Sequence, residues 1–341
     1  MSRFARLSSL SVAALSLVTL AALGALGTAS CAASVADPHA ASVAPPTPTK
    51  ARVGVYTSDA AGFDTKTVWF DTGREIVVFD AQFTERHAKE ALAAIRAESA
   101  SPIRYLVITH PNPDKFNGAL VFRRAGATVV ASRATAAAIP GVHAYKRAFF
   151  VETAKMFAPS DYPEEATVDL TFDGELTLDT DAGHITLREL CHSGVSSTQT
   201  VGFFSEANAL AVGDLVHHKA HAWLEGGIVN GRPTPDLTAW QLALDELLAF
   251  EGATVYGGRG EAAPVAEAVA SQKAYLVVAD KLVRDYVREL GDSARAELDG
   301  PRAAEHYAAL AKRFAAAFPE RQLGYLVQYG VYGLARAALG D

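Results

Sequence analysis

Polar side chains that could take part in chemistry follow four apolar runs of the sequence, each at the point where the run ends. They are His110, Asn112, Asp114 and Lys115 after the run 104–108, His192 after 184–190, Asp214 after 209–212, and Arg259 after 254–256. Short runs rich in Val, Ile and aromatic residues are typical of buried β-strands. Loops that follow neighbouring strands meet at one edge of a sheet, so we expect these side chains to converge on one site.

The order and spacing of these residues resemble the signature of the metallo-β-lactamase superfamily. That signature reads T-H-x-H-x-D-H-x-G, then G-H-x-x-G, then G-D and then G-H-G. The corresponding stretches here are THPNPDKFNG, CHSG, GD and GRG, within residues 52–260. The resemblance implies an α/β fold, a four-layer αββα sandwich whose active site lies at one edge between the two β layers.

The resemblance assigns His110, Asn112, His192 and Asp214 to a first metal ion. Two imidazoles and a carboxylate suit zinc, with iron or manganese as alternatives, whereas the neutral amide of Asn112 is a poor ligand. Two interpretations therefore stay open. The site holds one divalent metal, or it holds none and hydrogen bonds keep its histidines in place.

A second metal ion would take Asp114, Lys115, Asp214 and Arg259 by the same resemblance. Protonated lysine and arginine have no lone pair to offer a metal. We therefore expect the second metal to be absent, and the charges of Lys115 and Arg259 to compensate the two aspartates.

These assignments lead to two hypotheses for the function. The first is a hydrolase of an ester, amide, thioester or phosphoester that uses at most one metal, with Asp114 as the base. Lys115 and Arg259 would then stabilise an oxyanion or hold an anionic group of the substrate. The alternative is a non-catalytic, metal-free protein that binds an anionic small molecule through the same two cations.

Further candidates lie near Asp214. His217, His218 and His221 could supply a replacement ligand or bind substrate, although hydrogen-bonded or solvated imidazoles are the commoner outcome. Trp223 and Trp240 either line the pocket or pack in the core.

The elements that must position these residues follow from hydrophobic periodicity. Strands are expected at 53–56, 67–70, 75–79, 104–108, 128–131, 167–172, 175–178, 184–190, 200–204, 209–212 and 254–256, and helices at 84–97, 116–124, 145–156 and 237–250. We expect a metallo-β-lactamase-like domain over 51–261 and a helical extension over 262–341. An apolar seam in the extension packs on the sandwich or forms a homodimer.

The composition suits a folded protein that acts on small molecules. The chain has 341 residues, half of them hydrophobic, and a formal net charge of -7. An acidic chain without a basic run argues against binding to nucleic acid.

The first 31 residues resemble an export signal. Arg3 and Arg6 precede an uncharged apolar stretch, and Thr28 to Cys31 resembles the site at which bacterial lipoproteins are cleaved and acylated. Residues 32–50 are rich in Pro, Ala and Ser, as in a disordered tether. We expect a periplasmic or cell-envelope protein that is anchored to the membrane by lipid at Cys31. Ordinary cleavage to a soluble protein and an uncleaved membrane anchor are the alternatives.

Overall fold

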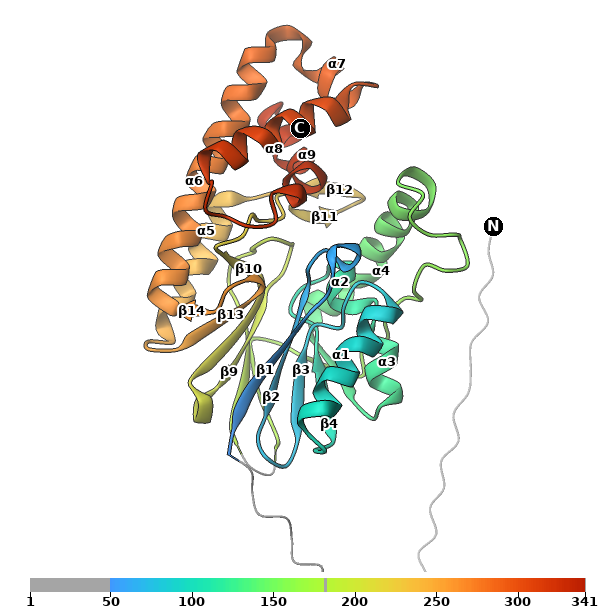
Figure 1. Cartoon of the computed structure of the whole chain (residues 1–341), viewed down its shortest axis with the longest axis vertical. Helices are drawn as coiled ribbons and strands as arrows, with labels where there is room; N and C mark the ends of the chain where they lie inside the picture. The colour runs from blue at the N-terminus through green and yellow to red at the C-terminus, as the bar shows by residue number, and fades with distance from the viewer. Residues whose placement is uncertain (1–49, 181–182, 341) are drawn as a thin grey trace, which may run out of the picture. The chain divides into compact units, whose positions relative to one another are not determined.

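Two six-stranded sheets form the centre of the computed structural model, which describes residues 50–180 and 183–340 (Figure 1). The first sheet contains, in spatial order, β1 (Arg52–Thr57), β2 (Lys66–Asp71), β3 (Ile76–Phe79), β4 (Ile103–Val107), β5 (Thr128–Ser132) and β6 (Leu170–Phe172). The pairs β1–β2 and β2–β3 are antiparallel, and β3 to β6 are parallel. The parallel strands β4 and β5 are largely buried, as expected for strands covered on both faces.

The second sheet carries four of the predicted site residues, which are Asp214, His217, His218 and Arg259. Its order is β14 (Ala263–Pro264), β13 (Thr254–Gly260), β10 (Ala209–His218), β9 (Thr200–Phe204), β8 (Ile185–Glu189) and β7 (Glu175–Leu178). Only β10 and β13 pair in parallel, and this register places His217 opposite Arg259. A separate hairpin is formed by β11 (Gly227–Val229) and β12 (Arg232–Thr234).

Helices cover the outer faces of both sheets (Figure 1). The first sheet is covered by α1 (Glu85–Glu98), α3 (Ala119–Arg124) and α4 (Arg133–Ala148), and the second by α5 (Leu237–Glu246) and α6 (Val265–Leu290). One apolar cluster fills the space between the sheets and two others lie under the helices. The predicted four-layer αββα sandwich is confirmed.

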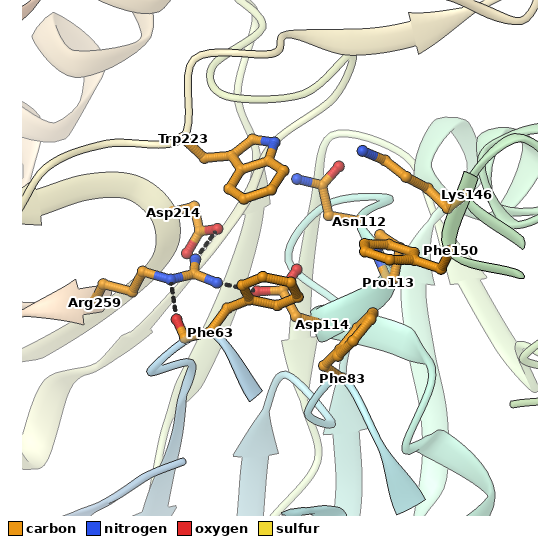
Figure 2. A pocket seen from close by; sticks show the side chains of 10 residues that line it. All are labelled: Phe63, Phe83, Asn112, Pro113, Asp114, Lys146, Phe150, Asp214, Trp223 and Arg259. Atoms are coloured by element: carbon orange, nitrogen blue, oxygen red, sulfur yellow. Dashed lines mark hydrogen bonds and ion pairs between the residues drawn. The ribbon is translucent and has the colours of Figure 1, made fainter. Parts of the chain in front are cut away.

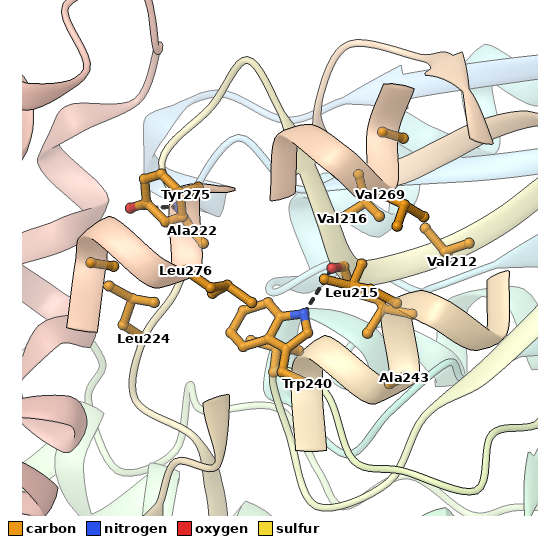
Figure 3. Close-up of a cluster of buried hydrophobic side chains, with 14 of the residues drawn as sticks. Val212, Leu215, Val216, Ala222, Leu224, Trp240, Ala243, Val269, Tyr275 and Leu276 are labelled. Atoms are coloured by element: carbon orange, nitrogen blue, oxygen red, sulfur yellow. Dashed lines mark hydrogen bonds between the residues drawn. The ribbon is translucent and has the colours of Figure 1, made fainter. Parts of the chain in front are cut away.

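The C-terminal region is helical, as predicted. After α6 come α7 (Ala294–Asp299), α8 (Ala303–Ala317) and α9 (Val327–Ala338). The apolar seam of α6 packs in one cluster with the second sheet, α5, α8 and α9, and Figure 3 shows Trp240 of α5 in that cluster, where its indole Nε1 donates to Leu215 O. No helix within 50–180 or 183–340 is long and apolar enough to cross a membrane.

Short elements complete the chain, and some boundaries differ from the prediction. The short helices are η1 (Ala60–Gly62), α2 (Pro113–Phe116), η2 (Phe149–Thr153), η3 (Ser205–Ala207), η4 (Leu247–Ala249), η5 (Gly291–Ser293) and η6 (Gly324–Leu326). Helix α4 begins at Arg133, not near residue 145, because Ser132 Oγ caps it by accepting from Thr135 N. The predicted leader, the anchor at Cys31 and residues 32–49 of the predicted tether lie outside the described residues.

Candidate functional site

The structure brings four of the predicted residues into one buried cluster between the sheets. Asp114 and Lys115 lie on the short helix α2, which follows β4, while Asp214 lies on β10 and Arg259 on β13. All four are less than a tenth exposed to solvent. Their convergence agrees with the expectation that loops and strand ends meet at one edge of the sandwich.

Each carboxylate of this cluster pairs with both cations. Lys115 Nζ lies 2.8 Å from Asp114 Oδ2 and 2.8 Å from Asp214 Oδ1. Arg259 Nη1 donates to Asp214 Oδ2 at 2.6 Å, and its Nη2 donates to Asp114 Oδ2 at 3.0 Å (Figure 2). Arg259 also donates from Nε to Phe63 O and from Nη2 to Thr65 Oγ1. The cluster is therefore a closed network of two anions and two cations.

The four charges persist despite burial. Burial alone would raise the pKa of Asp114 and of Asp214, but Lys115 and Arg259 outweigh it and hold both pKa values below their usual range. Burial alone would lower the pKa of Lys115, yet the two aspartates raise it. Both cations stay protonated and both aspartates stay ionised at neutral pH.

A third carboxylate, Asp80, lies beside the cluster. Its Oδ1 accepts hydrogen bonds from Thr109 N and Thr109 Oγ1, and its Oδ2 lies 3.9 Å from Lys115 Nζ. Burial raises the pKa of Asp80 to about 7. Sequence reasoning missed Asp80, although it directly follows the apolar run of β3 and so occupies the same kind of strand end as the residues that were selected.

Two fully buried histidines flank Asp214. His110 Nε2 lies 3.9 Å from Asp214 Oδ2, and His217 Nε2 lies 3.9 Å from Asp214 Oδ1. Neither Nε2 atom has a hydrogen-bond partner among the described residues, whereas His110 Nδ1 bonds with Thr109 Oγ1 at 2.9 Å. Burial lowers the pKa of His110 to about 4 and that of His217 to about 3, so both imidazoles are neutral.

The other predicted histidines are not brought to the cluster. The side chain of His192 is two-fifths exposed, and its Nδ1 bonds with Glu246 Oε1 of α5 at 2.8 Å. His218 Nε2 lies 3.3 Å from Glu267 Oε1 on α6, and His221 packs in the core with its Nδ1 3.3 Å from Tyr275 Oη. The expected placement of His192 beside His110 and Asp214 is thus not found, because its loop is held by the carboxylate of Glu246.

A pocket opens beside the cluster (Figure 2). It is lined by Phe63, Phe83, Asn112, Pro113, Asp114, Lys146, Phe150, Asp214, Trp223 and Arg259. It encloses about 340 Å³, including solvent at its mouth. Trp223 therefore forms part of the pocket, whereas Trp240 is a core residue. Sequence analysis did not select Lys146 or the three phenylalanines.

The residues of the cluster do not fit a divalent metal. Lys115 Nζ already bonds to one oxygen of each aspartate, and Arg259 takes the second oxygen of Asp214. Across residues 50–180 and 183–340, no group of three or more His, Cys, Asp or Glu side chains is arranged to hold a metal ion. The ammonium and guanidinium groups supply here the positive charge that a metal would otherwise bring.

The sequence profile of the metallo-beta-lactamase superfamily matches residues 61–259, which is more than half of the chain. The chain belongs to the metallo-β-lactamase superfamily. Membership of this superfamily suggests a hydrolase-type function, and members usually bind zinc. The matched region contains every residue of the cluster and all residues that line the pocket.

Solved structures with this superfamily's fold resemble the chain at low sequence identity. A metallo-β-lactamase from Pontibacter korlensis is 19% identical with a TM-score of 0.51, over 68% of this chain and 97% of that one. The mono-zinc form of the metallo-β-lactamase FIM-1 from Pseudomonas aeruginosa is 18% identical with a TM-score of 0.48, over 67% of this chain and 91% of that one. A comparison with curated proteins found no match.

Proposed function

We propose that this chain binds a small organic molecule in the pocket beside the cluster and does so without a metal ion. The observation that carries the proposal is the position of Lys115, whose ammonium lies 2.8 Å from both Asp114 and Asp214. A divalent cation could join these carboxylates only by displacing a buried, charged lysine. The superfamily fold then serves as a scaffold for a pocket, since a fold alone does not determine a chemistry.

The roles considered for the cluster residues in catalysis are poorly supported by their contacts. Asp114 is a weak general base because its pKa is held below the usual range by Lys115 and Arg259. The same two cations direct their N–H groups at protein oxygens, so they offer little to an anionic ligand. We therefore assign ligand binding to the pocket walls and not to Lys115 and Arg259.

A second candidate is a hydrolase that uses one metal, favoured by the imidazoles of His110 and His217. Their Nε2 atoms have no hydrogen-bond partner within the described parts of the chain, and each lies 3.9 Å from a different oxygen of Asp214. This arrangement would accept a metal only if Asp214 left its pairs with Lys115 and Arg259. The cost of breaking buried ion pairs makes it the weaker candidate.

Metal content and turnover decide between the two candidates. The purified chain is treated with a chelator, dialysed, and titrated with zinc by calorimetry. Ester, lactone, thioester, β-lactam and phosphodiester substrates are then assayed with and without zinc, manganese and ferrous iron. We expect no stoichiometric zinc binding and no metal-dependent hydrolysis.

The double variant K115H/R259H serves as the positive control, because it restores imidazoles at the two cationic positions and should bind zinc. Stoichiometric zinc in the unmodified chain, together with turnover that is lost in H217A, would establish the hydrolase instead.

A further inference from the structure

We infer that the pocket selects a small, uncharged aromatic molecule that carries a carboxamide or a similar group, and that Asn112 is the residue that recognises this group. The inference rests on the proposed function, because it names the class of ligand that the metal-free pocket would take. Three independent features of the pocket support it: its charge balance, the environment of Asn112, and its aromatic walls.

Each charged residue that lines the pocket has an ionic partner within the protein. Asp114 and Asp214 pair with Lys115 and Arg259, as described above. Lys146 Nζ pairs with Glu225, and both of these side chains are at most one-twentieth exposed. A charged ligand would lose its hydration on entering without gaining an unpaired counter-charge. The pocket therefore favours an uncharged molecule.

Asn112 is the uncharged polar residue of the pocket with unused hydrogen-bonding capacity. The residue is only 6% exposed, yet its carboxamide makes no hydrogen bond to any other residue in the described parts of the chain. In Figure 2 the carboxamide is directed toward the side of the pocket formed by Trp223 and Lys146. A carboxamide offers both donors and an acceptor, so its natural partner is another amide or a similar neutral group. A ligand amide would bond to this carboxamide in place of water.

The walls of the pocket suit an aromatic ring. The rings of Phe63 and Phe83 meet edge to face with their centroids 5.0 Å apart, and the rings of Phe83 and Phe150 are 4.9 Å apart. Trp223 packs against Phe63 at 5.8 Å, and its indole Nε1 is held by Glu225 Oε2 at 2.8 Å. A planar ring can extend this chain of edge-to-face contacts. The limited space between the walls restricts the ligand to a small molecule.

Benzamide is the probe that tests all three features, because it joins one ring to one neutral carboxamide. Benzoate and benzylamine have nearly the same shape but carry a negative and a positive charge. Each is titrated into the purified full chain, and binding is followed by NMR at the side-chain amide of Asn112 and the indole N–H of Trp223. We expect benzamide to shift both signals and to bind at least tenfold more tightly than either charged analogue.

Two variants test the role assigned to Asn112. N112L removes the hydrogen bonds at similar side-chain volume and should lower the affinity for benzamide about tenfold. N112D keeps the shape but adds a negative charge, so it should reverse the preference and bind benzylamine more tightly than benzamide. A loss of structure cannot produce this reversal. N230D changes an exposed asparagine in the β11–β12 hairpin and should leave all three affinities unchanged.

The possible outcomes separate this inference from the proposed function. If benzoate or benzylamine shifted the Trp223 signal and bound as tightly as benzamide, the proposed ligand class would be wrong, although the pocket would still bind a ligand. Unchanged selectivity in N112D would overturn the role of Asn112. If none of the three molecules shifts either signal, the inference falls, and the metal titration and hydrolysis assays then decide the function separately.

Discussion

Lys115 is the residue on which the chemistry of the cluster depends. Its ammonium is fully buried and bonds to carboxylates from two different elements, Asp114 on α2 and Asp214 on β10. Buried charges are tolerated in proteins only when they are paired and hydrogen-bonded. The charges of this cluster are thus balanced by side chains of the protein itself.

Removing the charge of Lys115 should destabilise the protein strongly. In K115M the two aspartates keep only Arg259 as a partner, and we expect a loss on the order of 3–5 kcal/mol in the free energy of unfolding, measured with urea. The control is K89M, which removes the exposed pair of Lys89 with Glu85 and should leave stability unchanged. A K115M protein as stable as the wild type would show that Lys115 does not compensate these charges.

Asp80 should make stability depend on pH. Its pKa of about 7 in the folded chain lies above the value near 3.9 expected when unfolded, so between these values the folded chain holds a proton that the unfolded chain has lost. The contribution of Asp80 to stability is therefore present at low pH and is lost as the pH rises through 7.

The variant D80N isolates this effect. It cannot ionise, so its stability relative to wild type should increase from pH 5 to pH 8 by roughly 2–3 kcal/mol in urea titrations. The buried His110 and His217 contribute a slope of the opposite sign, because their pKa values are lowered, but this slope is common to both proteins and cancels in the difference. A difference that does not change with pH would contradict the raised pKa of Asp80.

The sequence predicted the charged residues of the cluster better than its histidines. Each of the four charged residues comes after a short apolar run, and such runs are visible in the local pattern of the sequence; they are Asp114, Lys115, Asp214 and Arg259. The surroundings of His192 depend on Glu246, which lies 54 residues away. His217 approaches Asp214 because the register of β10 against β13 shifts between Gly213 and His217, where a regular strand would turn positions 214 and 217 to opposite faces.

At the level of elements, most strands of both sheets were predicted because their apolar runs are short and clearly bounded. The exceptions are β14, which was missed, and the ends of β10 and β13, which continue past the apolar runs 209–212 and 254–256 to His218 and Gly260. The start of α4 was missed because the middle of the helix contains Pro140 and Gly141, which usually end a helix. The β11–β12 hairpin was also missed. The three phenylalanines of the pocket come from the residue that follows η1, the loop before α1, and η2, so no single segment of sequence shows them as a group.

Helix α9 should be needed to hold Trp223 in the pocket wall. Gly330 and Gly333 let the helix lie against the backbone of residues 223–225, and a Cβ at Gly333 would come within 2.0 Å of Glu225 O. Tyr332 of the same helix donates to Glu225, the residue that also accepts from Trp223 Nε1. The C-terminal extension therefore positions a wall of the pocket.

The variant G333A tests this arrangement. We expect it to lower stability by roughly 1–3 kcal/mol, to shift the indole N–H signal of Trp223, and to weaken benzamide binding. The matched control is G141A in α4, where a Cβ meets nothing within 4 Å. That variant should be as stable as wild type or about 0.5–1 kcal/mol more stable. If G333A and G141A had the same stability and the same Trp223 signal, α9 would not be needed to position the wall of the pocket.

At the level of the whole molecule, we propose that the chain is exported and anchored by lipid at Cys31, on the evidence of the apolar leader and the small residues before that cysteine. C31S should release the protein from the membrane fraction or block its maturation, as followed by fractionation and immunoblotting of cells that express the full chain. C191S is the control, because it removes the other cysteine and should keep the wild-type distribution. Membrane partition that survives in C31S would exclude the lipid anchor.

The cluster also has a consequence for the order of folding. Asp114 and Lys115 are neighbours in the sequence and belong to the half of the sandwich built on the first sheet, while Asp214 and Arg259 lie on paired strands of the other half. Each half contributes one carboxylate and one cation. Across the interface between the halves, Lys115 then donates to Asp214 and Arg259 donates to Asp114. Either half can therefore collapse first, because its own two charges of the cluster sum to zero. Because these charges are balanced by side chains, and under the proposed function no metal ion is bound, refolding from urea should proceed at the same rate whether or not the buffer contains a chelator.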